Sequence, residues 1–164
     1  MSQDKLHEEL IKFLQDAHAM EQQSLQTLQA AVAVAGDPAL ESLYQGHIVE
    51  TKRHLELLDE RLDTHDSSRS LVKDLSGRLT ATQVAFGAVA DSDTPAKVVA
   101  IAYGFEHFEI AMYELLRRVA ERAGDQDAVL TADKILVNER QAAEKLAASY
   151  DLALERSIYP AVKA

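Results

Sequence analysis

Four long stretches of helical periodicity, joined by two tight turns and one long connector, restrict this chain to very few folds. Apolar side chains recur at intervals of three and four residues through about 3–35, 38–63, 95–123 and 127–155. In the first turn, Gly36 suits the end of a helix, Asp37 the cap of the next one and Pro38 its first turn. The sequence GDQ at 124–126 separates the last two stretches. We therefore expect two helical hairpins.

The long connector decides how the two hairpins are joined. A helix of about 27 residues is roughly 40 Å long, and residues 64–94 are numerous enough to span that length and return the chain to its starting end. Helices two and three would then run parallel, as in ferritin-like bundles with one long crossover. Residues 71–90 carry a weaker helical pattern. The expected fold is an all-α, ferritin-like four-helix bundle, one domain over residues 1–164, with an extra helix in its crossover 64–94.

The composition excludes several classes of function. The 164-residue chain has a formal net charge of −10 and no basic cluster, which argues against nucleic-acid binding. It contains no cysteine, so any metal must be held by Asp, Glu or His. The N-terminal residues lack an apolar secretory core, and no apolar run approaches membrane-spanning length. We expect a cytoplasmic protein with no membrane partner.

Acidic residues lie within all four apolar stripes, where an unpartnered carboxylate would be costly to bury. The chemically active residues of the stripes are Glu21 in the first, His47, Glu50 and His54 in the second, Glu106 and Glu109 in the third, and Glu139 in the fourth. Each long helix therefore places at least one acid toward the expected interior.

The acids also lie at matching heights. Glu21 lies 15 residues before the glycine of the first turn, and Glu50 lies 14 after it. Glu109 lies 15 residues before the glycine of the second turn, and Glu139 lies 15 after it. Because equal counts mean equal heights in an antiparallel hairpin, all four acids are expected to meet in one layer halfway along the bundle.

Such a layer needs counter-charge, and a pair of divalent cations is the most economical source. No Lys or Arg lies centrally on the stripes, and Arg53 lies only at an edge. Carboxylates with imidazole suit iron or manganese and do not exclude zinc, and this combination describes di-metal carboxylate bundles. Taken singly, a Glu in such a stripe is more often an edge residue, and a His a satisfied core residue. The matched heights favour the di-metal interpretation, in which His18 and His47 support the ligands from behind.

Four segments carry a family resemblance: DAHAMEQQSL (16–25), GDPALESLYQGHIVETKRHLELLDERL (36–62), AKVVAIAYGFEHFEIAMYELLRRVAERAG (96–124) and NERQAAEKL (138–146). Over about residues 4–155 the chain resembles the ferritin-like superfamily, and within it the bacterial YciE/YciF-type stress-associated family. The resemblance implies a stress-induced homodimer without a firmly assigned reaction. By motif it also implies the metal ligands, which are Glu21, Glu50 as the bridging acid, His54, the pair Glu106 and Glu109, and Glu139.

Two departures from the superfamily pattern concern the second metal. In ETKRH the His follows the Glu by four residues instead of three, and in ERQA Ala142 stands where a His is expected. We therefore expect an asymmetric centre, with one ion held by Glu50, His54 and shared acids. The other ion would be held more weakly, by carboxylates and water alone.

The expected function is that of a non-haem protein that binds two iron or manganese ions and handles peroxide, dioxygen or free iron under stress. As an enzyme it would be an oxidoreductase of the peroxidase, catalase or ferroxidase type, among which the sequence does not choose. The alternative is a non-enzymatic dimeric scaffold with a degenerate metal site.

Overall fold

The computed structural model describes residues 3–65 and 94–160, which form helices and no strand. The helices are α1 (Gln3–Val34), α2 (Pro38–Thr64), α5 (Pro95–Ala123), α6 (Gln126–Ala148) and α7 (Tyr150–Ile158). The all-α prediction is confirmed for these residues. None of these helices is long and apolar enough to cross a membrane.

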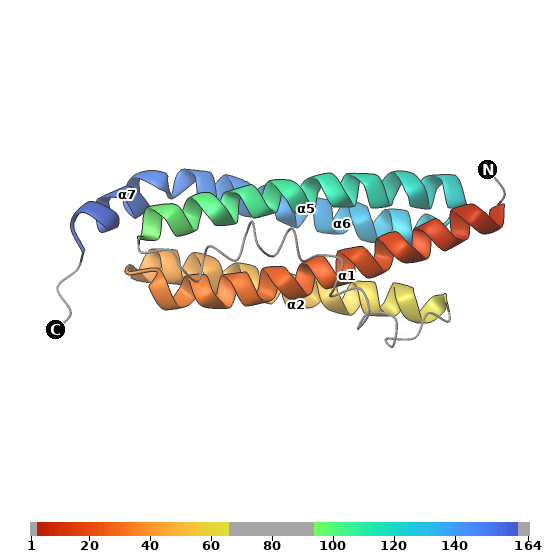
Figure 1. The fold of residues 1–164 in the computed structure, drawn as a ribbon, viewed down its shortest axis with the longest axis horizontal. Coiled ribbons are helices and arrows are strands. Elements are labelled where there is room, and N and C mark those ends of the chain that lie inside the picture. Colours follow the sequence, from red (N-terminus) through yellow and green to blue (C-terminus); the bar gives the residue numbers. More distant parts are fainter. Residues whose placement is uncertain (1–2, 66–93, 161–164) are drawn as a thin grey trace.

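The four long helices lie side by side as two antiparallel hairpins, α1 with α2 and α5 with α6 (Figure 1). α2 ends at one end of the bundle and α5 begins at the other, so these two helices run parallel (Figure 1). This is the arrangement expected from one long crossover. The extra helix predicted at 71–90 lies outside the described residues.

Local sequence fixes where the hairpins turn. Gly36 and Gly124 have positive φ angles of 66° and 78°, a conformation that glycine adopts at little cost. The carboxylates of Asp37 and Asp125 then cap α2 and α6, each accepting a backbone N–H of the following helix at 2.8 Å. These two turns set the relative heights of the paired helices.

The fourth long segment consists of two helices where one was expected over 127–155. α6 ends at Ala148, and the shorter α7 begins at Tyr150. Between them, the hydroxyl of Ser149 donates to the carbonyl oxygen of Leu146 at 2.8 Å. This local hydrogen bond competes with the helical one and accounts for the break.

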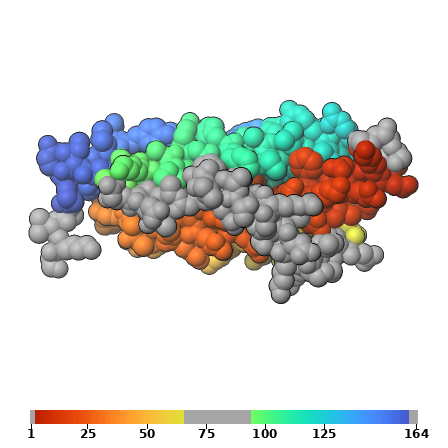
Figure 2. Space-filling model, viewed as in Figure 1, coloured from red at the N-terminus to blue at the C-terminus, as the bar shows by residue number. Residues whose placement is uncertain are grey.

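α7 is tied to the starts of two other helices. Arg156 Nε donates to Asp37 Oδ2 at 2.8 Å, beside the first turn of α2. The hydroxyl oxygen of Ser157 accepts the backbone N–H of Ala96 at 2.9 Å, near the start of α5. In the space-filling view α7 lies at one end of an elongated molecule and the beginning of α1 at the other (Figure 2).

The buried apolar side chains form two clusters instead of one continuous core. Along α1, Leu14 belongs to the first cluster and Leu28 to the second, and Glu21 lies between them. Along α2, Leu58 belongs to the first and Tyr44 to the second. The middle of the bundle is therefore a polar layer between two apolar halves.

Gly124→Ala and Gly46→Ala are predicted to change stability in opposite directions. At neither position would an added Cβ meet an atom within 4 Å, so crowding does not distinguish the two. At the positive φ of Gly124 a side chain costs about 1–2 kcal/mol, whereas inside α2 Ala is favoured over Gly46 by about 0.5–1 kcal/mol. Urea unfolding measures both changes, and a more stable Gly124→Ala variant would contradict the turn described above.

Candidate metal centre

Buried acids from three helices meet in the middle layer. Glu21 of α1, Glu109 of α5 and Glu139 of α6 have no exposed surface. Glu106, one turn before Glu109, is only 1% exposed. Each of these acids lies on the buried side of its helix among apolar neighbours.

On α2 the buried positions at this height are histidines and not the expected acid. The buried seam of α2 passes through His47, Thr51 and His54, at alternating intervals of four and three residues. Glu50 precedes Thr51 and therefore points about 100° away from it around the helix. The Glu50 side chain is 28% exposed and lies at the edge of the bundle.

The side chains form two groups of potential ligand atoms that share one residue. The first group is His47, Glu106, Glu109 and Glu139, and the second is Glu21, His54 and Glu139. Within each group the ligand atoms all lie within 4.8 Å of one another. Every expected ligand except Glu50 belongs to a group, and His47, expected behind the ligands, belongs to the first.

The two nitrogens of His47 face different partners. Nε2 lies 3.1 Å from Glu106 Oε2 and 3.5 Å from Glu139 Oε2. On the outer side, Nδ1 lies 3.1 Å from Glu50 Oε2. A carboxylate that accepts the Nδ1 proton orients the ring and leaves the Nε2 lone pair directed at the acids, which is the usual arrangement behind a metal-binding histidine.

His54 repeats this pattern in the second group. Nδ1 lies 2.9 Å from Glu139 Oε1 and 3.3 Å from Glu21 Oε1, while Nε2 lies 3.2 Å from Asn138 Oδ1. Burial lowers the pKa of His54, but the contacts with Glu139 and Glu21 outweigh burial and raise the value to about 10. Without a metal, both nitrogens of this imidazole are therefore protonated at neutral pH, and the ring carries a positive charge.

Many inward-facing atoms of the layer lack a hydrogen bond. Among the described residues, such buried atoms include Glu21 Oε2, His47 Nε2, His54 Nδ1, Glu106 Oε2, Glu109 Oε1 and both carboxylate oxygens of Glu139. The short distances from His47 Nε2 and His54 Nδ1 to the acids are thus not aligned N–H···O bonds. Because each unsatisfied buried polar atom costs about 1–3 kcal/mol, the convergence of several on one layer is the pattern of a binding centre.

The charge of the layer leads to the same conclusion. Its four carboxylates carry four negative charges when ionised, and its two imidazoles offset at most two. Within the described part of the chain, no Lys or Arg forms an ion pair with these carboxylates. Two like charges at such distances repel by roughly 4 kcal/mol at an effective dielectric constant of about 20. Two divalent cations would balance all four acids.

Burial and mutual repulsion change the affinity of the acids for protons. Burial raises the pKa of Glu109 well above its ordinary value, and the carboxylates of Glu139 and Glu21 add to the effect. Burial also raises the pKa of Glu21, and that of Glu106 to about 8. Although burial opposes it, contacts with His54 and Glu106 lower the pKa of Glu139. Glu139 is thus the acid that stays ionised without a metal.

Two hydroxyl groups hold acids of the layer from across the α1–α5 interface. The Tyr113 hydroxyl donates to Glu21 Oε1 at 2.5 Å, and the Ser24 hydroxyl donates to Glu109 Oε2 at 3.4 Å. The sequence shows Ser24 only as a member of an apolar stripe, and Tyr113 as an interior aromatic residue whose hydroxyl is able to hydrogen-bond to a ligand. Ser24 follows Glu21 by one helical turn, and Tyr113 follows Glu109 by one turn. This spacing is the feature of the sequence that places both hydroxyl groups near the acids.

Two further residues differ from the sequence interpretation. His18, expected to support the ligands, lies outside both groups, with Nε2 3.3 Å from Asp59 Oδ1. Asn138, which sequence reasoning did not single out, holds the outer nitrogen of His54. Nothing in its position beyond its adjacency to Glu139 indicated this contact.

Glu109→Gln is predicted to stabilise the metal-free protein, because Glu109 must take up a proton to be buried beside the other acids, and Gln keeps the same shape without that cost. We expect the melting temperature to rise by a few degrees, since about 1 kcal/mol corresponds to roughly 2–4 °C in a domain of this size. Glu114→Gln is the matched control, because Glu114 lies outside the layer and accepts hydrogen bonds from Arg118 and Arg140. A lower melting temperature for chelator-treated Glu109→Gln would mean that this carboxylate stabilises the fold.

Several solved structures have the same fold. A protein from Xanthomonas campestris pv. campestris is 26% identical, with 94% of this chain and 96% of that chain covered at a TM-score of 0.75. The E. coli stress protein YciF is 22% identical, with 94% and 98% covered at 0.70. A third match is a two-domain protein from Anabaena variabilis that contains DJ-1/ThiJ/PfpI-like and ferritin-like domains. It is 19% identical, with 89% of this chain and 40% of that chain covered at a TM-score of 0.72. The ferritin-like fold is confirmed.

A family model agrees with these structural matches. The family described as a domain of unknown function (DUF892) matches residues 5–157. This range is close to residues 4–155, over which the sequence resembles YciE/YciF-type proteins, and that resemblance is confirmed. The chain therefore belongs to the DUF892 family, and it has a ferritin-like fold that it shares with YciF.

Proposed function

We propose that this protein binds two iron or manganese ions in the middle layer of its bundle and uses them to handle peroxide, dioxygen or ferrous iron. The observation that carries the proposal is the convergence of buried carboxylate and imidazole atoms that have no hydrogen bond. These carboxylate and imidazole atoms suit metal ions, because a bound cation takes the place of the missing hydrogen bonds and also balances the negative charges of the carboxylates.

Two ions fit the two groups of donors. The residues that would hold them are His47, Glu106 and Glu109 for one, His54 and Glu21 for the other, and Glu139 for both. Each group includes one imidazole, so His47 supplies the donor that Ala142 does not. This replaces the expected asymmetry, in which one ion would have had only carboxylates and water. The two groups still differ in their number of acids, because the first has three carboxylates and the second has two.

Glu50 has a different role in this proposal from the bridging ligand expected from sequence. Its Oε2 lies against the outer nitrogen of His47, and its carboxylate belongs to neither donor group. Glu50 is therefore a positioning residue that fixes the orientation and tautomer of the His47 ring. Glu139, which is common to both groups, is the better candidate for the bridge.

The donor set indicates which ions are suitable. Carboxylate oxygens with imidazole nitrogens favour iron and manganese, and the absence of cysteine removes the ligands preferred by softer ions. Two such ions would supply redox chemistry to a small oxidant. The chain itself keeps the centre dry between two apolar clusters and holds its acids through Tyr113 and Ser24.

Metal content of purified protein tests the centre. Protein from cells supplied with iron and manganese, purified without chelators, should contain about two ions per chain, the number held by comparable carboxylate bundles. Glu139→Ala should reduce this number more than His54→Ala does, because Glu139 belongs to both groups. Glu144→Ala, an exposed acid on the same helix, should leave it unchanged. Metal content equal to a buffer blank would leave only the scaffold interpretation.

The same preparations test the reaction. Iron-loaded protein should consume hydrogen peroxide or dissolved oxygen faster than an equal concentration of Glu139→Ala, as measured with an oxygen electrode and a peroxide assay. A dependence on ferrous iron as co-substrate would identify a ferroxidase, and oxygen release from peroxide would identify a catalase. Equal rates in the two proteins would contradict a reaction at this centre.

The proposal also includes a homodimer that acts under stress. Its support is the resemblance to the YciE/YciF-type family, and the solved E. coli relative is itself described as a stress protein. Sedimentation of the purified chain and its abundance after oxidative challenge of the source cells would test these two points separately.

A further inference from the structure

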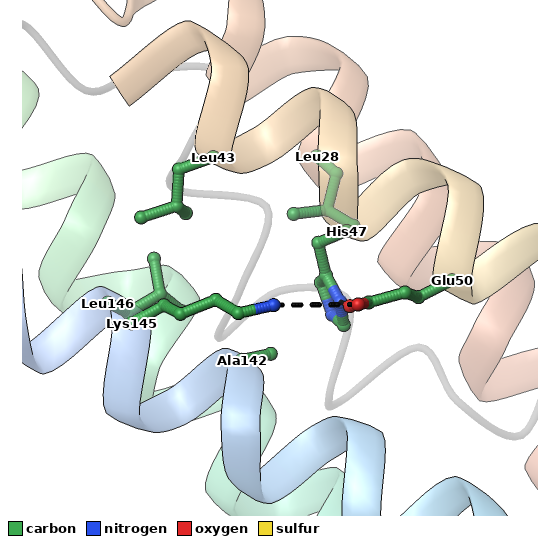
Figure 3. A pocket seen from close by; sticks show the side chains of 7 residues that line it. All are labelled: Leu28, Leu43, His47, Glu50, Ala142, Lys145 and Leu146. Carbon is green, nitrogen blue, oxygen red and sulfur yellow. Dashed lines mark hydrogen bonds and ion pairs between the residues drawn. The ribbon is translucent and has the colours of Figure 1, made fainter. Parts of the chain in front are cut away.

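A small pocket in the interface between α2 and α6 ends at one of the proposed ligands. Its walls are apolar, with Leu28 and Leu43 on one side and Ala142 and Leu146 on the other, and the imidazole of His47 forms its inner wall (Figure 3). Its volume of about 10 Å³ is close to the space that one water molecule needs. His47 is only 4% exposed, so this pocket gives the imidazole little contact with solvent.

One ion pair lies across this pocket. Lys145 Nζ of α6 and Glu50 Oε1 of α2 are 3.5 Å apart and join the two helices (Figure 3). Their side chains are 55% and 28% exposed, and ion pairs of this kind hold weakly. The other oxygen of Glu50 lies 3.1 Å from His47 Nδ1. A single carboxylate thus touches both the exposed ammonium and the inner imidazole.

The ring of His47 lines this pocket, and its Nε2 lies 3.1 Å from Glu106 Oε2, so the pocket and the acids share contact with one imidazole. A larger pocket of about 250 Å³ between α5 and α6 is lined by Tyr103, His107 and Arg140 among others, and by no residue of the two donor groups. Of these two pockets, the one at the α2–α6 interface includes a residue of a donor group, His47, in its lining.

We infer that the α2–α6 pocket is the route by which divalent metal ions enter and leave the buried layer, with the Lys145–Glu50 pair as its removable cover. The Lys145 ammonium occupies the position where an arriving cation would meet Glu50. An ion that displaces this ammonium gains a carboxylate partner next to His47. This inference rests on the proposed metal centre and gives Glu50 a second role, as the first acid that the ion contacts.

The rates of metal uptake and release distinguish a physical barrier at the pocket from a purely electrostatic effect of the Lys145 charge. Removing a barrier accelerates uptake and release by the same factor and leaves the dissociation constant unchanged. Removing a positive charge without opening a route would accelerate uptake of a cation but slow its release. The release rate of a Lys145 variant therefore distinguishes the two effects.

The experiment uses Co²⁺ as the probe, with uptake followed by its visible absorption in a stopped-flow instrument and release followed after addition of excess chelator. Lys145→Ala should accelerate both steps about two- to five-fold, the range expected for loss of one exposed ion pair. Lys134→Ala, an exposed lysine of the same helix, should change neither. Slower or unchanged release from Lys145→Ala would overturn the inference.

Leu43→Trp tests the same route in the opposite direction. The larger side chain narrows the pocket at a position away from the acids, so uptake and release should both slow by a similar factor, while the dissociation constant stays the same. Leu130→Trp, at a position 58% exposed on α6, is the matched control. If Leu43→Trp does not fold, as judged by circular dichroism, the exposed Lys145 position still decides the question.

The outcomes separate this inference from the proposal on which it rests. If the wild-type protein binds no Co²⁺ at the buried centre, the proposed function fails and the route fails with it. If the wild type binds Co²⁺ but neither Lys145→Ala nor Leu43→Trp changes the rates, the centre stands and the route is wrong.

Discussion

The burial of four carboxylates in one layer is the constraint on which the rest of this structure depends. Glu21, Glu106, Glu109 and Glu139 are at most 1% exposed, and the atoms of each donor group lie within 4.8 Å. Without counter-ions, the layer is tolerable only with protons on most of its acids, as their raised pKa values indicate. The two apolar clusters on either side must supply the stability that the layer removes. A bundle selected for stability alone would place leucines at these positions.

The layer exists because two independent features of the sequence agree. The turns at Gly36 and Gly124, followed by capping aspartates, fix the height of each helix relative to its hairpin partner. The seam of three- and four-residue intervals fixes which side of each helix faces inward. An acid lies in the layer where it has both the right height along its helix and a position on the inward side, as Glu21 does. α2 and α5 run parallel, and the acids of the two hairpins meet at one level, which is the arrangement of ferritin-like bundles with one long crossover.

Much of this arrangement can be predicted from the sequence, and the failures have definite causes. Counting from the turns predicted heights correctly but does not predict facing, so it selected Glu50 where the seam of α2 passes through His47 and His54. The periodicity of α2 already placed His47 and His54 in its apolar stripe, and the same spacing applied strictly would have left Glu50 outside that stripe. The break at Ser149 depends on one local hydrogen bond and leaves no trace in hydrophobic periodicity. The contact of Asn138 with His54 joins two helices, and spacing within one helix does not reveal it.

The central claim is that this layer holds two metal ions with Glu139 between them. The most direct measurement is anomalous X-ray scattering from crystals of the protein grown with Mn²⁺. The account predicts two anomalous peaks in the middle of the bundle, roughly 3.5–4 Å apart as in other two-metal sites, one beside His47 and one beside His54. A map with no peak in this layer, or with peaks only at surface acids, would contradict it.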